Sequence, residues 1–171
     1  MKPLSMPVRL FAVMFFAAFT TTAMAITGAW TGQLRDSQGN AEVTTYRFSD
    51  SGYPILKFAA RGGWREFEVR SVGQRHEWLL RGPGYATAVV RALAVTEDRV
   101  QVIVGISTNS GSGALLDQGE RRLALDFKLG PNGLETVVMS ESLNHSSGAG
   151  LGLYAGSRSR VVKEGVLRPA R

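Results

Sequence analysis

The sequence contains no cysteine and only two histidines in 171 residues. The absence of cysteine excludes disulfides, cysteine–zinc sites and thiol nucleophiles. The two histidines, His76 and His145, lie far apart, and no His-x-x-x-His or similar spacing predicts a metal site. We therefore expect no metal and no cofactor, and a fold held together by packing and hydrogen bonds.

A long apolar run occurs only at the start of the chain. Two basic residues precede the run Leu10–Phe19, and a small-x-small cleavage pattern ends at Ala25. This order is typical of a secretory signal peptide. The apolar core of about ten residues is too short to span a bilayer as a permanent helix. We expect residues 1–25 to be a signal peptide cleaved after Ala25. Residues 26–171 are then expected to form one domain in a bacterial periplasm or outside the cell.

Charge of one sign is not concentrated anywhere in the sequence. Without Lys2 and Arg9, 18 basic residues (20 − 2) remain against 14 acidic residues. Arg65 alternates with Glu66 and Glu68, which indicates an ion-paired outer surface rather than a pair of catalytic carboxylates. Nucleic-acid surfaces need clustered basic residues with stacking aromatics, so we expect no nucleic-acid partner.

Apolar and polar residues alternate along the chain after residue 25, and no stretch has a convincing helical period. The clearest case puts Leu123, Leu125, Phe127 and Leu129 on one face of a strand. Turn signals rich in Gly, Asn, Asp and Pro separate such segments at hairpin spacing. The pattern predicts strands of five to ten residues near 26–35, 42–49, 54–60, 64–72, 75–81, 85–95, 99–107, 120–129, 133–140 and 158–167.

These short connections favour an antiparallel meander. Closing the sheet on itself also removes the exposed edges that an exported protein must otherwise protect. We therefore expect an all-β fold, namely a single antiparallel up-and-down β-barrel of about 8–10 strands. The chain ends at Arg171 rather than at an aromatic residue, and most expected strands are shorter than a membrane-spanning strand requires. We therefore expect no stable membrane insertion.

The strand near 85–95 has only small residues on one face. That row leaves room beside the strand, either for close packing of a bulky layer, which is the favoured interpretation, or for one wall of a cavity. The residues of the row are Ala86, Ala88, Val90, Ala92 and Ala94.

Two segments interrupt the meander. Residues 108–113 and 142–157 are rich in Gly and Ser and show no period. Loops as long as the second are uncommon in compact domains and are often functional. The second contains His145 and several serines, but Gly-x-Ser-x-Gly is absent and no orienting acid is evident. We therefore expect no enzymatic activity.

The beginning of the expected domain carries a family resemblance. Gly28-Ala29-Trp30, on the first strand of a small exported all-β chain, resembles the opening motif of the calycins, which include lipocalins, avidins and fatty-acid-binding proteins. The resemblance implies that Trp30 closes the barrel floor. It also implies a packing partner for Trp30 late in the chain, for which Arg158 and Arg160 are the candidates.

Two functions remain open. The first is a non-catalytic carrier that holds a small apolar ligand inside the barrel. The alternative is an envelope or extracellular protein-interaction module, either an inhibitor or an assembly factor, whose partner binds the loops 108–113 and 142–157. The candidate ligand-binding residues are Trp30, Tyr46, Phe48, Phe58, Phe67, Trp78 and Phe127.

Overall fold

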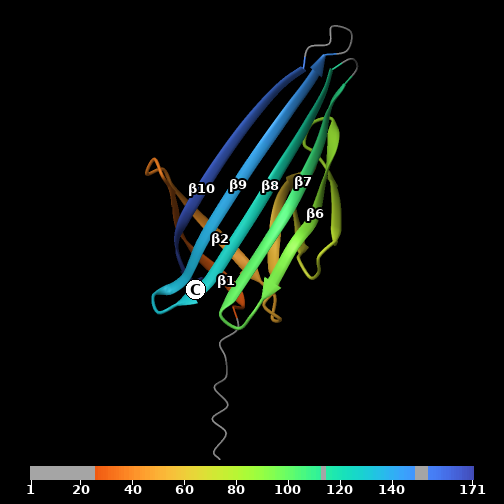
Figure 1. Ribbon diagram of the computed structural model, residues 1–171. Coiled ribbons are helices and arrows are strands. Elements are labelled where there is room, and N and C mark those ends of the chain that lie inside the picture. Colours follow the sequence, from red (N-terminus) through yellow and green to blue (C-terminus); the bar gives the residue numbers. More distant parts are fainter. Residues whose placement is uncertain (1–25, 113–114, 149–153) are drawn as a thin grey trace, which may run out of the picture.

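The computed structural model describes residues 26–112, 115–148 and 154–171, and these residues form ten β-strands and no helix (Figure 1). The prediction of an all-β fold is confirmed. Within the described residues there is accordingly no helix long and apolar enough to cross a bilayer. The strands are β1 (Gly28–Asp36), β2 (Ala41–Phe48), β3 (Pro54–Ala60), β4 (Gly63–Glu68), β5 (Arg75–Leu79), β6 (Gly84–Val95), β7 (Arg99–Ser112), β8 (Leu115–Gly130), β9 (Gly133–Gly148) and β10 (Tyr154–Pro169).

All ten strands belong to one antiparallel sheet with the order β4-β3-β2-β1-β10-β9-β8-β7-β6-β5. Every strand pairs with the next one along the chain except β4 with β5, and β10 returns to pair with β1. The predicted up-and-down barrel is therefore confirmed, as a sheet that curls into a nearly closed barrel.

The two ends of the sheet meet without a continuous ladder. The backbone N–H of Arg61, in the turn after β3, donates to the carbonyl oxygen of Leu79 on β5 at 2.8 Å. The indole Nε1–H of Trp78 donates to the carbonyl oxygen of Ala59 at 3.1 Å. These contacts join β3 to β5 and satisfy part of the backbone that two open edges would otherwise expose.

The core includes buried residues from most strands of the barrel. Phe127, Leu134 and Leu167 come from three neighbouring strands, and all are fully buried. The alternation seen in the sequence is kept on β8, where Leu125 and Phe127 are buried and Leu123 packs against the core. Burial of one face only also fixes the strand register, because a slip of one residue would exchange the two faces.

A β-bulge breaks the expected row of small residues on β6. The register with β7 shifts between Val90 and Ala92, which leaves Arg91 without a partner. Ala86 and Ala88 face the core and are completely buried, whereas the last two alanines of the row lie on the opposite face. A bulged residue offsets the two-residue period by one position, so the prediction of a continuous small-residue wall was wrong.

The two expected loops are largely strand. Residues 108–112 belong to β7, 142–148 to β9 and 154–157 to β10, while 113 and 149–153 lie outside the described residues. The ladder between β8 and β9 continues as far as Leu115 opposite Gly148. Strands β7–β10 are therefore 14 to 16 residues long, longer than predicted. Alternation marks a strand only where one face is buried, and backbone pairing does not require it.

Candidate functional site

The barrel contains a hollow of about 580 Å³ in its upper half, here called the interior cavity. Most of its lining comes from inward positions of β1, β2, β3, β8, β9 and β10, and the rest from outward positions of β2, β3 and β4. Buried side chains of the core, including Leu125, lie directly beneath it. The apolar part of the wall includes Leu34, Leu56, Phe58, Leu123, Leu125, Val138 and Val161.

Polar groups line the same cavity. Arg121 on β8 donates from Nε to the hydroxyl of Ser140 on β9 at 2.8 Å, and Lys163 forms an ion pair with Glu42. Burial raises the pKa of the Tyr46 phenol above its usual value, and the nearby Glu42 carboxylate adds to the increase. Tyr46 is therefore a neutral hydrogen-bonding group at neutral pH, near the Arg121 cation.

A gap between β2 and β3 gives access to the cavity from the side. The ladder between these strands has only two residue pairs, both at the start of β3. Thr45 on β2 and Ile55 on β3 line the cavity on the two sides of this gap, together with Trp64. The Trp64 ring is 59% exposed, and the cations of Lys57 and Arg81 lie 5.3 Å and 6.0 Å from its centre.

Only two of the seven aromatic residues proposed from the sequence line the cavity. Those two are Tyr46 and Phe58. Trp30 is partly buried against the core, and its indole Nε1–H donates to the carbonyl oxygen of Thr27 at 2.9 Å. The other four are buried core residues, namely Phe48, Phe67, Trp78 and Phe127.

Aromatic rings form the floor and one side of the cavity. The Phe127 ring meets the rings of Tyr46 and Phe48 edge to face, each at a centroid distance of 5.0 Å. The Phe58 ring stacks on Trp78 at 4.7 Å. Such contacts add about 0.5–1.5 kcal/mol each beyond burial of area, so these rings stiffen the wall that Tyr46 and Phe58 present to the cavity.

The structure does not bring Trp30 together with Arg158 or Arg160. Trp30 lies opposite Pro169 at the lower end of β10, whereas the two arginines lie in its upper half. From Pro169 to Arg158 is eleven positions (169 − 158), which corresponds to about 36 Å of extended strand. Arg158 instead forms an ion pair with Glu141 on the outer face of the sheet.

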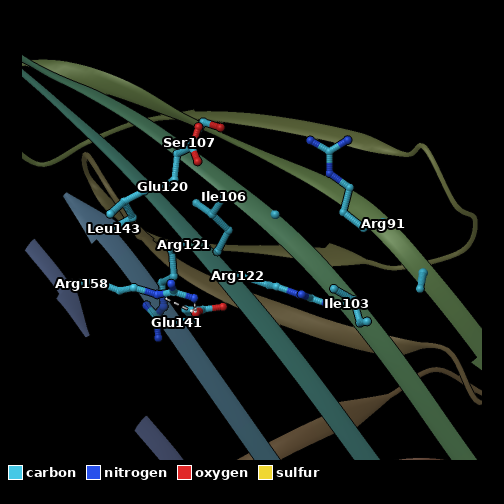
Figure 2. Close-up of a pocket in the computed structure, with 12 residues that line it drawn as sticks. Arg91, Ile103, Ile106, Ser107, Glu120, Arg121, Arg122, Glu141, Leu143 and Arg158 are labelled. Carbon is cyan, nitrogen blue, oxygen red and sulfur yellow. Dashed lines mark hydrogen bonds and ion pairs between the residues drawn. The ribbon is translucent and has the colours of Figure 1, made fainter. Parts of the chain in front are cut away.

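A second hollow, the outer groove, lies on the outer face of β6–β10 and has a volume of about 610 Å³ (Figure 2). Arg122 lies opposite Gly105 on one side and Glu141 on the other. Gly105 has no side chain, so the side chain of Arg91, the bulged residue, can lie over its backbone. A Cβ at position 105 would be 3.1 Å from the Nε of Arg91. Figure 2 shows Arg91 and the Arg158–Glu141 pair on opposite sides of this groove.

The sequence reasoning missed the cations inside the barrel. Arg121 precedes Leu123 by two positions, and the same two-residue period that places Leu123 and Leu125 inside also places Arg121 inside. That signal was available in the sequence. The positions of Glu42 and Lys163 were not predictable in the same way, because their proximity depends on the return of β10 to β1.

No three His, Asp or Glu side chains lie close enough to hold a metal ion in the part of the chain that the structure describes. In comparisons with known proteins, no family model, no curated protein and no solved structure matches this chain. The function must therefore be argued from the barrel, its interior cavity and its outer surface.

Proposed function

We propose that this chain is an exported, non-catalytic carrier that holds one small ligand in the interior cavity. The observation that carries the proposal is the cavity itself, about 580 Å³ above a filled core and lined on most sides by apolar side chains. This volume lies within the range of ordinary small-molecule sites, roughly 300–1,000 Å³. A barrel that served only as a rigid support would gain stability from filling that space.

The lining favours a ligand with an apolar body and an anionic or hydrogen-bonding end. Leu56, Leu123 and Val138 offer an apolar surface. Arg121 and Lys163 offer positive charge, and no described carboxylate forms an ion pair with Arg121. A guanidinium forms charge-assisted hydrogen bonds with a carboxylate, sulfonate or phosphate. The apolar ligand expected from the sequence is thus refined to an amphipathic one.

Entry through the gap between β2 and β3 is the simplest route. The two strands separate after two paired residues, so no ladder hydrogen bonds have to break for a ligand to pass. Trp64 and the nearby cations of Lys57 and Arg81 present an aromatic surface and two positive charges at that gap. The same combination suits a ligand that is apolar at one end and anionic at the other.

The proposal includes a calycin-like ancestry and export. Gly28 and Trp30 stand on the first strand of a nearly closed up-and-down barrel, which is compatible with that resemblance. Intact mass after purification tests export, because cleavage after Ala25 removes residues 1–25 from the measured mass. A purified protein that retains them would contradict the export part and leave the cavity proposal unchanged.

Native mass spectrometry of the purified protein, followed by titration with 1-anilinonaphthalene-8-sulfonate, tests the carrier. The expected result is an extra mass that disappears on denaturation, or a single saturable site for the probe. Val138→Phe fills the cavity and is expected to reduce probe affinity at least about tenfold. Val137→Phe is the matched control, because Val137 is the preceding residue and lies on the outer face, 41% exposed.

Two results would reject the proposal. One is the absence of both a bound molecule and a saturable site in the unmodified protein. The other is equal probe affinity in Val138→Phe and Val137→Phe, since the probe would then bind outside the cavity. Circular dichroism and the melting temperature of each variant show that the comparison concerns folded protein.

A further inference from the structure

The upper half of β10 has a neighbouring strand on one side only. β10 pairs with β9 from Tyr154 to Leu167, but its ladder with β1 begins only at Lys163. The reason is the length of the β1–β2 hairpin, which turns back after Asp36 while β10 continues upward (Figure 1). The segment Ser157–Val162, here called the free edge, is exposed along its whole length.

The register identifies the backbone groups that this edge presents. The N–H of Ala170 donates to the carbonyl oxygen of Ala29 on the β1 side at 2.8 Å. Backbone groups of an antiparallel strand point alternately to its two sides, and the register of β10 is continuous from there upward. Arg158, Arg160 and Val162 therefore direct their N–H and C=O groups away from β9, where the described residues provide no strand.

The outer face beside this edge carries mostly positive charge. Arg160 lies opposite Glu141, and Glu141 in turn lies opposite Arg122. Arg158 forms its ion pair with Glu141 and keeps 73% of its side chain exposed. One carboxylate therefore lies among three guanidinium groups, and Arg91 extends the positive surface across the outer groove (Figure 2). Glu120 is the other acidic group lining this groove.

We propose that the free edge binds an extended acidic segment of a partner protein by strand addition. Such a segment completes the backbone hydrogen bonds of Arg158, Arg160 and Val162, as peptides do at other open sheet edges. Because side chains alternate across a sheet, every second residue of the segment lies beside Arg158 and Arg160. Glu or Asp at those positions meets the two guanidinium groups, and small or apolar residues between them face the side of Ser159 and Val161.

A second copy of this chain fits the same edge poorly. Antiparallel pairing of two free edges would place Arg158 and Arg160 beside the arginines of the other copy, and like charges directly across a sheet are destabilising. Charged residues on edge strands commonly prevent self-association. Arg158 and Arg160 repel the arginines of a second copy and attract acidic side chains, so the partner is a different chain.

Fluorescence anisotropy with a labelled peptide tests the proposal. The probe is a peptide of about seven residues in which glutamate alternates with valine and threonine, a length that matches the free edge. We expect saturable binding that Arg158→Gln combined with Arg160→Gln weakens about tenfold. The control combines Arg168→Gln with Arg171→Gln. It removes the same charge from the C-terminal end of the chain, where β10 is paired with β1, and is expected to change the affinity less than about twofold.

A second pair of variants separates backbone pairing from simple charge attraction. Val162→Pro removes one outward N–H without removing a charge or a ladder bond to β9, and is expected to weaken binding about fivefold relative to Val162→Ala. Two further probes carry N-methyl groups on every second amide, one peptide for each of the two alternate patterns. One of these peptides should lose binding and the other should keep it. Equal binding of all these forms, or no binding by the unmodified protein, would overturn strand addition. Because Arg158 and Arg160 do not line the interior cavity, this result does not depend on the carrier proposal.

Discussion

Arg121 and Arg122 are consecutive residues of β8, but their guanidinium groups lie on opposite faces of the sheet. Arg121 donates to Ser140 beside the interior cavity, while Arg122 lies opposite Glu141 in the row that crosses the outer groove. Their opposite orientation follows from the two-residue period of an extended strand. Arg121 is also among the residues that line the outer groove, but of the two arginines only Arg121 lines the interior cavity.

This relationship gives a direct test of ligand chemistry. We expect Arg121→Gln to weaken binding of a sulfonate or carboxylate probe about tenfold, because a charge-assisted hydrogen bond is lost in the cavity. An uncharged probe of similar size is expected to bind Arg121→Gln as well as the unmodified protein. Titration of both probes measures the difference, with Arg122→Gln as the matched control. A similar loss in Arg122→Gln would indicate long-range charge rather than contact.

The floor of the cavity depends on Phe127. Its ring is fully buried and contacts both Tyr46 and Phe48. We expect Phe127→Ala to lower the free energy of unfolding by about 3–5 kcal/mol, since a large cavity would open in a packed region. Urea unfolding measures this loss. Val43→Ala, at a side chain that is 75% exposed, should change stability by less than about 0.5 kcal/mol.

Gly84 allows the start of β6 to approach β7. Its φ is +116°, and a Cβ there would lie 2.1 Å from the carbonyl oxygen of Asn109. We expect Gly84→Ala to lower the free energy of unfolding by at least about 2 kcal/mol, because both the backbone conformation and the contact become strained. Gly82→Ala is the control, since nothing lies within 4 Å of its Cβ position. Equal melting temperatures of the two variants would contradict this interpretation.

His76 carries a buried polar atom that the fold leaves unused. Its Nε2 has no hydrogen-bond partner among the described residues, and its ring stacks on Phe67 at 5.2 Å with 4° between the planes. We expect His76→Phe to keep the stack and raise the free energy of unfolding by about 1 kcal/mol, because the cost of the unpaired nitrogen disappears. His76→Ala should lower it, since the stack is lost. Thermal unfolding of both variants decides the point, and a lower stability of His76→Phe would show that the nitrogen is satisfied in solution.

Asp126 and Arg99 couple stability to acidic pH. Arg99 donates from Nε and Nη2 to the two carboxylate oxygens of Asp126, at 2.9 Å and 2.6 Å. These hydrogen bonds lower the pKa of Asp126 below its usual value of 3.8 in the folded state. A lowered folded-state pKa means that the stabilisation is complete well above pH 3.8 and is lost as the pH falls through the folded-state value.

Asp126→Asn is therefore expected to be less stable than the unmodified protein near neutral pH, by about 0.5–1 kcal/mol because the pair is partly exposed. The difference should shrink as the pH is lowered from about 5 to about 2. Urea unfolding over that pH range measures it. A stability difference between Asp126→Asn and the unmodified protein that stays constant over this pH range would mean that folding does not change the pKa of Asp126.

Much of the barrel was predictable from local pattern. The alternation through Leu123, Leu125 and Phe127 gave the buried face of β8 correctly, and each of the ten expected strands overlaps one observed strand. Local pattern failed at Arg91, because a bulge offsets the period without changing composition. It failed again at 142–148, where Ser and Gly residues are paired in β9 without the alternation that one-sided burial produces.

The candidate site was predictable only in part, for a related reason. Aromatic type alone could not separate Tyr46, which lines the cavity, from Phe127, which fills the floor beneath it. Height along the barrel decides between these two roles, and it depends on how strands of unequal length are staggered. The pairing of Glu42 with Lys163 likewise required β2 and β10 to flank β1.

The sequence by itself determined where the ten strands lie, which face of most strands is buried, and that the strands follow one another in a meander, because these properties depend on neighbours a few residues apart. The tertiary structure alone decided where β10 meets β1, how far it continues past Lys163, and therefore which edge remains open. It also decided where the packed core ends and the interior cavity begins. These features depend on the relative lengths and stagger of strands that lie far apart in the chain, which no local pattern records.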